Sequence, residues 1–429
     1  MIPTELFHRA SSRRASGAVR YCSTGEKLSF HYPGSIITSM TDRTADERFL
    51  RRALDLASQG TGLASPNPRV GAVIVDPQGN IVGTGAYTYD GVKHAEVRAL
   101  EHAGEKARRA TLYINLEPCS HRGRTPPCAD AVIAAGIQRV VASMDDPNPQ
   151  VSGRGFGKLR AAGIQVETGL LEPEARRLNE SFARYIRHGV PLVTLKAAMT
   201  LDGKIAPPPT QSFDRTPGVP PGGWITSEAA REHVQQLRHQ HDAIMVGAGT
   251  ILRDDPLLTD RSGHPRRRPL LRVILDSRLR LPLESRLLES VRNGDSIQND
   301  VLVFSSAPNG TKKAQLEERG IRVEQLPPTA PDGRPDLHAV LIRLGQLEIT
   351  NALIEGGATV NGAALASGIV DKVFLYYAPK ILGGTGSVPF STGAGFRHLN
   401  EAAQVKAFEL HRFGEEFAVE GYVRDPYRD

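Results

Sequence analysis

The chain is organised around the stretch from residue 94 to residue 128. It contains His94-Ala95-Glu96 and, after a helical and a strand-like segment, Pro118-Cys119-Ser120-His121-Arg122-Gly123-Arg124-Thr125-Pro126-Pro127-Cys128. A neutral imidazole and two thiolates bind zinc tightly, and three protein ligands leave the fourth tetrahedral position to a water molecule. His94, Cys119 and Cys128 therefore predict a catalytic zinc site.

Glu96 is the expected catalytic residue of this site. It lies two residues after the histidine, within reach of the water but not placed to bind the metal. Zinc lowers the pKa of a bound water toward neutrality, and a neighbouring carboxylate can carry the proton to a departing amine. A His-x-Glu sequence followed by Pro-Cys and a second cysteine is typical of zinc-dependent base deaminases.

The spacing of the cysteines departs from the common Pro-Cys-x-x-Cys pattern, because eight residues separate Cys119 from Cys128. Two other interpretations account for the same residues. The cysteines are two unrelated buried thiols and His94 is a surface residue, or His121 is the fourth ligand of a closed structural zinc site. The second interpretation leaves Glu96 without a role.

The composition indicates a globular protein with room for two domains. The chain has 429 residues, 40% of them hydrophobic and 23% charged, and no apolar run reaches the length of a membrane span. Three cysteines cannot form a disulfide framework, which fits a reducing compartment. The net charge of +6 invites a nucleic-acid ligand, but the basic residues are spread along the chain, and this balance also suits phosphorylated small molecules.

From Thr44 onward, helical and strand-like periods alternate without an internal repeat. In the first half this predicts strands at 70–75, 81–87, 111–116, 139–143 and 164–170, with helices at 94–103, 129–135, 156–162 and 172–188. The alternation predicts an α/β layered domain. His94 and Cys128 fall at predicted helix N-termini, where the helix dipole favours thiolates.

The second half predicts another α/β unit, with glycines between strands and helices. Gly247-Ala248-Gly249 and Glu355-Gly356-Gly357 each follow a predicted strand. Backbone N–H groups at such turns can approach a pyrophosphate, and a helix N-terminus adds a positive end. Each pattern alone is equally consistent with a tight turn between a strand and a helix.

The long spacer Pro-Cys-Ser-His-x-Gly-Arg-Thr-Pro-Pro-Cys resembles the deaminase of riboflavin biosynthesis. Thr-Leu-Asp-Gly-Lys, Trp-Ile-Thr-Ser, Gly-Thr-x-x-x-Asp-Asp-Pro and Asp-Ser resemble the reductase of that pathway. From about Asp46 to the C-terminus, the chain resembles the bifunctional diaminohydroxyphosphoribosylaminopyrimidine deaminase/5-amino-6-(5-phosphoribosylamino)uracil reductase family. This implies a cytidine-deaminase-like α/β/α domain at residues 43–189 and a dihydrofolate-reductase-like α/β domain at residues 190–429, after an extension at residues 1–42.

The resemblance implies two successive reactions. The first is the hydrolytic deamination of 2,5-diamino-6-(5-phosphoribosylamino)pyrimidin-4(3H)-one, and the second is the NADPH-dependent reduction of its ribosyl group to ribityl 5-phosphate. The implied cofactors are one zinc ion per chain and NADPH; no motif in the sequence itself selects the 2′-phosphate. The expected partner is the small phosphoribosyl pyrimidine, without nucleic acid or membrane, in an assembly of identical chains.

Residues 1–42 are rich in serine and arginine and show no period. This composition is typical of an organelle transit peptide. We favour the alternatives, which are a disordered tail or a start codon assigned upstream of the true one. The expected location is the cytoplasm, or an organelle if residues 1–42 are a transit peptide.

In the first half, the resemblance places Asn67, His121, Arg124 and Asn148 around the substrate. The amides of Asn67 and Asn148 offer donors and acceptors to a pyrimidine edge, and Arg124 suits the substrate phosphate. The family often has histidine at the position of Tyr87, so the role of this tyrosine stays open.

In the second half, the resemblance implies a cofactor set and a substrate set. The NADPH site would contain Met199, Trp224, Thr250, Asp254 and Ser277, with the phosphates at Gly357, Ala358, Thr359, Val360, Asn361, Gly362 and Ala363. The substrate would face Lys196, Gly222, Arg238, Leu258, Arg261 and Glu355. Guanidinium groups bind phosphate in bidentate fashion, so Arg238 and Arg261 are expected at the ribose phosphate, although an arginine is also a common solvated surface residue. Gly222 stands where the family often has serine, in a loop (207–223) that is longer than expected.

Two other functions fit parts of the sequence. A deaminase of free nucleosides or RNA bases should carry a basic patch and aromatic stacking groups near its zinc, yet only 6% of the residues are aromatic. A pseudo-deaminase that keeps zinc as a scaffold would not need Glu96. Metal analysis combined with an ammonia-release assay separates these functions from the bifunctional enzyme.

Overall fold

The computed structural model describes residues 40–208, 223–293, 296–297, 299–306, 309–328 and 333–428. The chain divides into two units, Met1–Arg43 and Thr44–Asp429, and both of the large sheets belong to the second. Gly222 and most of the 207–223 loop lie outside the described residues, as do residues 1–39.

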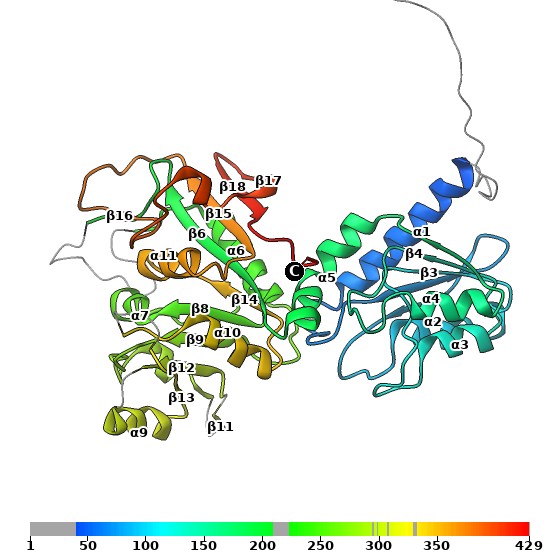
Figure 1. Cartoon of the computed structure of the whole chain (residues 1–429), viewed down its shortest axis with the longest axis horizontal. Coiled ribbons are helices and arrows are strands. Elements are labelled where there is room, and N and C mark those ends of the chain that lie inside the picture. Colours follow the sequence, from blue (N-terminus) through cyan, green and yellow to red (C-terminus); the bar gives the residue numbers. More distant parts are fainter. Residues whose placement is uncertain are drawn as a thin grey trace, which may run out of the picture. The chain divides into compact units, whose positions relative to one another are not determined.

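A five-stranded mixed sheet forms the first α/β layer structure (Figure 1). Its strand order is β2-β1-β3-β4-β5, and β3 and β4 are labelled in Figure 1. The strands are β1 (Gly71–Val75), β2 (Ile81–Ala86), β3 (Thr111–Ile114), β4 (Arg139–Ala142) and β5 (Gln165–Thr168). β1 pairs antiparallel with β2 and β3, whereas β3, β4 and β5 are parallel. Parallel strands need crossover connections, and helices provide them here.

Helices pack on both faces of this sheet. One face is covered by α2 (Ala95–Ala103), α3 (Cys128–Ala134) and α4 (Arg154–Ala161), and the other by α1 (Met40–Ser58). Glycine at position 85 lets α2 approach β2 closely, since a Cβ atom there would lie 2.1 Å from the carbonyl oxygen of Ala95. This close approach fixes the N-terminus of α2, where His94 and Glu96 lie.

A nine-stranded sheet forms the second α/β structure, in the order β13-β12-β9-β8-β14-β6-β15-β18-β17. The strands are β6 (Leu192–Thr200), β8 (Ala243–Gly247), β9 (Leu271–Leu275), β12 (Val301–Ser305), β13 (Arg322–Gln325), β14 (Asn351–Ile354), β15 (Lys372–Ala378), β17 (Lys406–Phe413) and β18 (Glu416–Tyr422). The first seven in spatial order are parallel, and the β17–β18 hairpin closes one edge antiparallel. Small pairings join β7 (Lys204–Ala206) to β16 (Val388–Pro389) and β10 (Arg292–Asn293) to β11 (Ser296–Ile297).

Successive side chains of the central strands point into two apolar cores. One core packs against α10 (Leu337–Gln346) and α11 (Ala358–Ala366). The opposite face packs against α6 (Glu228–Gln240), α7 (Ala248–Asp254), α8 (Arg286–Glu289) and α9 (Gly310–Glu318). The predicted fold class, two different α/β units, is confirmed.

The predicted strands and helices form within a few residues of their expected bounds, including α5 (Glu172–His188). Two short 3₁₀ helices, Gly104–Ala107 and Leu399–Glu401, complete the elements. None of the helices among the described residues combines the length and the apolar composition needed to cross a bilayer.

Candidate active sites

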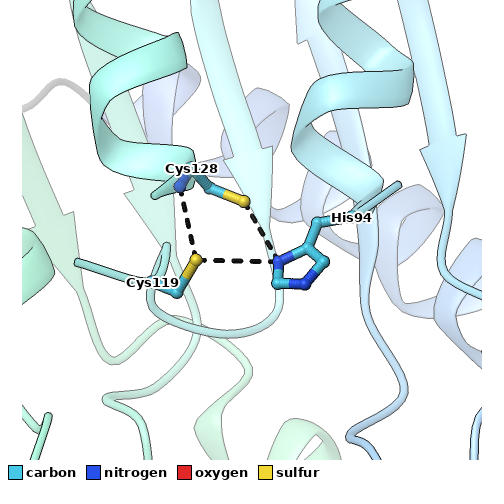
Figure 2. Close-up of side chains that lie close together, drawn as sticks. All are labelled: His94, Cys119 and Cys128. Atoms are coloured by element: carbon cyan, nitrogen blue, oxygen red, sulfur yellow. Dashed lines mark hydrogen bonds between the residues drawn. The ribbon is translucent and has the colours of Figure 1, made fainter. Parts of the chain in front are cut away.

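Three local features of the first sheet bring the predicted zinc ligands together (Figure 2). His94 is the N-cap residue of α2, Cys119 follows β3, and Cys128 is the first residue of α3. The Nδ1 atom of His94 lies 3.1 Å from Sγ of Cys128 and 3.6 Å from Sγ of Cys119. The backbone N–H of Cys128 donates to Sγ of Cys119 at 3.3 Å.

This geometry fits zinc. Tetrahedral zinc with Zn–S bonds of about 2.3 Å and Zn–N bonds of about 2.0 Å requires ligand atoms roughly 3.5 Å apart. The three ligand atoms all lie within 4.8 Å of one another. His121 does not belong to this group in the part of the chain that the structure describes, which favours the open catalytic site over the closed structural one.

The charges at the site suit proton transfer. A hydrogen bond from Cys128 lowers the pKa of Cys119 to about 4, whereas the same pairing raises the pKa of the Cys128 thiol. Burial, followed by the nearby Cys119 thiolate, raises the pKa of Glu96 to about 7. Glu96 is only 3% exposed. A carboxylate with a pKa near neutrality can both accept and release a proton at physiological pH.

Two of the zinc ligands, His94 and Cys119, line a cavity of about 270 Å³, which is also lined by all four residues predicted for the deaminase substrate. It is lined by Asn67, Tyr87, His94, Glu96, Leu116, Cys119, His121, Arg124, Asp146, Asn148, Phe182 and Ile186, among others. His121 and Arg124 belong to the exposed loop between the two cysteines. The guanidinium of Arg124 lies over the ring of Tyr89 at 4.4 Å and donates a hydrogen bond to the backbone carbonyl oxygen of Tyr89 at 3.2 Å.

Tyr87 and Asp146 contribute to this cavity although no role was predicted for either. Tyr87 is buried; its ring meets His94 edge-on at 5.5 Å, and its hydroxyl accepts a hydrogen bond from Asn67 at 2.6 Å. Burial raises the pKa of Asp146 to about 6, and this carboxylate accepts the backbone N–H of Asn148. The Asp-Asp-Pro sequence that begins three residues after the end of β4 is the signal that points to Asp146.

Phe182 and Ile186 supply part of the cavity wall from α5. The sequence offers no sign of this, because α5 follows the zinc motif by more than forty residues and carries no motif of its own.

In the second half, Lys196, Arg238 and Glu355 meet although they come from β6, α6 and the end of β14. Arg238 donates to Glu355 through Nε at 2.7 Å and through Nη2 at 3.1 Å, and Lys196 Nζ lies 3.4 Å from the same carboxylate. Burial raises the pKa of Glu355, but the charges of Arg238 and Lys196 outweigh it and lower the value to about 2. The site thus holds an ionised carboxylate between two cations.

The other predicted substrate residues differ in exposure. Arg261 is exposed, and its guanidinium has no hydrogen bond or ion pair within the described parts of the chain, although its backbone N–H donates to Gln235. The side chain of Leu258 is buried in the core around Ile244 and Ile274, so only its backbone remains to face a ligand.

Two glycine turns converge where the cofactor phosphates were expected. Gly247 and Gly357 are the N-cap residues of α7 and α11, and neither helix has a side-chain cap. A Cβ atom on Gly247 would lie 2.8 Å from Val360, and one on Gly357 would lie 4.0 Å from the hydroxyl of Thr250. Uncapped N–H groups at two adjoining helix N-termini fit a pyrophosphate.

The remaining predicted cofactor residues flank these turns. Thr250 and Asp254 lie on α7, and the phosphate segment 357–363 runs into the first two turns of α11. Met199 is buried near the end of β6, Ser277 follows β9, and Trp224 is 45% exposed beneath the guanidinium of Arg231.

Two family descriptions match the chain. Residues 43–144 match the cytidine and deoxycytidylate deaminase zinc-binding region, and residues 191–419 match the RibD C-terminal domain. The riboflavin biosynthesis protein RibD of Actinobacillus pleuropneumoniae is 39% identical over 399 residues, which cover 93% of this chain and all of that protein. RibD of Escherichia coli is 40% identical over 87% of this chain and 98% of its own length.

Solved structures agree with these relatives. RibD of Acinetobacter baumannii superposes with a TM-score of 0.74 at 34% identity, covering 89% of this chain and 99% of that one. The deaminase/reductase of Thermotoga maritima superposes with a TM-score of 0.72 at 35% identity, with the same coverage. Because the chain combines a zinc-binding deaminase domain with a reductase domain and matches these relatives over most of its length, the protein belongs to the RibD family of bifunctional, zinc- and NADPH-dependent deaminase–reductases of riboflavin biosynthesis.

Proposed function

We propose that the cavity around His94, Cys119 and Cys128 binds the phosphoribosylated diaminopyrimidinone and that Glu96 moves the proton in its deamination. The observation that carries this is the placement of Glu96, which is buried and lines one cavity with the metal ligands His94 and Cys119, while Cys128 completes the ligand group. The ribosyl group of the deaminated product is then reduced at the site in the second half of the chain.

Deamination replaces a carbon–nitrogen bond by a carbon–oxygen bond. When bound, zinc supplies a water molecule whose pKa is lowered toward neutrality. Glu96 would take a proton from the water whose oxygen adds to the amino-bearing ring carbon, and it would deliver this proton to the nitrogen, which leaves as ammonia. Glu96 is buried, which limits the access of bulk water to the carboxylate that would carry the proton.

The surrounding side chains orient the pyrimidine. The amides of Asn67 and Asn148 offer hydrogen bonds to the polar edge of the ring. Asn67 already donates to the hydroxyl of Tyr87 at 2.6 Å, so the Tyr87 hydroxyl keeps its own hydrogen for an acceptor in the cavity. Arg124 and His121 lie on the exposed loop at the cavity, where they suit the ribose phosphate.

Reduction adds a hydride and a proton to the ribosyl group. NADPH, when bound at the converging turns of α7 and α11, supplies the hydride. Lys196 is the proton donor that we propose, because its ammonium is held at 3.4 Å from the Glu355 carboxylate. Arg261, whose guanidinium is free of partners in the described residues, is placed to take the phosphate, while Arg238 fixes Glu355.

We also propose domain boundaries at residues 42/43 and 189/190, an assembly of identical chains, and a cytoplasmic location. The matched ranges 43–144 and 191–419 and the bacterial relatives support the boundaries and the location. The assembly of identical chains remains a prediction, and light scattering of the purified protein would test it.

The Glu96→Gln variant tests the proposed mechanism. It should keep its zinc, because glutamine leaves all three ligands in place, yet release ammonia at least a hundredfold more slowly, a typical contribution of acid–base catalysis. Ammonia release at the normal rate from a zinc-loaded variant would assign the proton transfer to another group.

A further inference from the structure

Two arginines from different halves of the chain contact the ring of Tyr89. Arg124, on the loop between the zinc-binding cysteines, lies over the ring at 4.4 Å. Arg267, which precedes β9 of the nine-stranded sheet, lies over the same ring at 3.6 Å. Arg124 lines the deaminase cavity and has no other hydrogen-bond or ion-pair partner among the described residues than Tyr89.

Arg267 is fixed more firmly than Arg124. Its side chain is 20% exposed, and its Nη1 donates to the carbonyl oxygen of Ser65 at 3.0 Å. Its backbone N–H donates to the carbonyl oxygen of Gly62 at 2.9 Å. Asp90, which is 76% exposed, lies 3.5 Å from Nε and adds little because solvent screens it.

These contacts link Arg267 to two substrate residues of the deaminase cavity. The segment from Gly62 to Ser65 leads directly into Asn67, and the backbone N–H of Tyr89 donates to Leu63 within it. Tyr89 is the one described residue that Arg124 contacts through a hydrogen bond and its ring, and Arg267 contacts the same ring. Arginine stacks on aromatic rings more effectively than lysine does, because its guanidinium is planar.

We propose that Arg267 is a positioning residue of the deaminase site: through Tyr89 it holds Arg124 in place for the phosphate of the substrate. The second half of the chain thereby contributes to the first reaction. This inference rests on the proposed role of Arg124, and it predicts that phosphate affinity in deamination depends on a residue outside the deaminase domain.

The test compares deamination kinetics of the full-length zinc-loaded wild type, Arg267→Ala and Arg124→Ala. In Arg267→Ala the KM for the phosphoribosyl substrate should rise about tenfold, equivalent to about 1.4 kcal/mol, with kcat nearly unchanged. The KM for the dephosphorylated ribosyl analogue should not change, since only the phosphate depends on Arg124. The double variant should show little further rise in KM over Arg124→Ala, because the two residues act as a unit.

Arg176→Ala provides a matched control. Arg176 of α5 stacks on Tyr427 at 3.9 Å, which is the same kind of contact between the two halves, but it does not line the cavity. This variant should deaminate like wild type. An equal rise in KM in this control, an unchanged KM in Arg267→Ala, or a KM effect that persists on the dephosphorylated analogue would each overturn the proposal.

Two further outcomes remain decisive. If Arg267→Ala does not fold, Tyr89→Leu removes the ring from the same stack and should produce the same phosphate-dependent rise in KM; a normal KM in Tyr89→Leu would overturn the proposal. If wild type itself releases no ammonia, the proposed function fails, and Arg267 loses its role with it. If wild type releases ammonia and Arg267→Ala has the same KM as wild type, only the positioning role of Arg267 is contradicted.

Discussion

Arg238→Ala should destabilise the reductase domain as well as impair its reaction. The side chains of Arg238 and Glu355 are only 12% and 10% exposed, and two contacts, at 2.7 and 3.1 Å, join them. Removing one partner of a buried ion pair costs about 3–5 kcal/mol. Since Lys196 remains at 3.4 Å from Glu355, we expect the lower end, about 3 kcal/mol.

The same contacts set the pH dependence of this loss. Burial raises the pKa of Glu355, and the cations Arg238 and Lys196 lower it to about 2, below its ordinary value of 4.5. A lowered carboxyl pKa contributes stability that is present above pH 4.5 and is lost as the pH falls toward 2. In Arg238→Ala the pKa should rise, so the difference in stability from wild type should be largest near neutral pH.

Chemical denaturation at pH 7, followed by a probe in the reductase domain, measures this loss, and NADPH oxidation with the deaminated substrate measures the activity. Arg261→Ala is the control. Removing this exposed arginine should raise the substrate KM by about tenfold or more, which corresponds to the loss of one charge-assisted hydrogen bond, and it should not lower the stability. The KM for NADPH should stay near wild type in Arg261→Ala. Unchanged stability of Arg238→Ala would refute the buried pair, and a loss confined to NADPH binding in Arg261→Ala would reassign that arginine to the cofactor.

Three other predictions follow from the same structure. Cys119→Ser or Cys128→Ser should each lose zinc and ammonia release, as metal analysis would show; full zinc content in either would contradict the ligand set. A chain that begins at Val190 should reduce the deaminated substrate without zinc. It should melt at a lower temperature than a chain that begins at Glu172, because residues of α5 form ion pairs with residues of β15 and β17. Equal melting temperatures of the two chains would contradict this stabilising role of α5. Burial lowers the pKa of His241 to about 4. As the pH falls, this histidine is therefore protonated in the unfolded chain before it is protonated in the folded chain. The free energy of unfolding should then decrease by up to about 3 kcal/mol between pH 6.5 and pH 4. The His241→Gln variant should lack this part of the pH dependence in denaturation curves. The same pH dependence in the variant and in wild type would exclude a contribution from His241.

The strands and most helices were predictable because their signals are local. Short, mostly apolar runs marked β1, β8, β9 and β14. The helix α10 (Leu337–Gln346) was not predicted, although Asp336 caps it and apolar residues recur on one face. The pairing of nine strands into one sheet, by contrast, joins segments more than a hundred residues apart and has no local signal.

The zinc site was predictable for the same reason, since its ligands lie within 35 residues and their spacing encodes the chemistry. The reductase site was less predictable from the sequence. The residue types of Lys196, Arg238 and Glu355 indicate phosphate or proton chemistry, but only the tertiary structure makes Arg238 the partner of a buried carboxylate. The stack of Arg124, Tyr89 and Arg267 likewise depends on loops that meet only in the folded chain.

The central claim is that one chain carries out deamination and then reduction. The most direct measurement incubates the zinc-loaded protein with the phosphoribosylated diaminopyrimidinone and NADPH, and follows ammonia and NADPH together. We predict one ammonia released for each NADPH oxidised, with ammonia appearing first, and in Glu96→Gln both signals should fall while the deaminated substrate is still reduced. NADPH oxidation at the normal rate without release of ammonia would contradict the account.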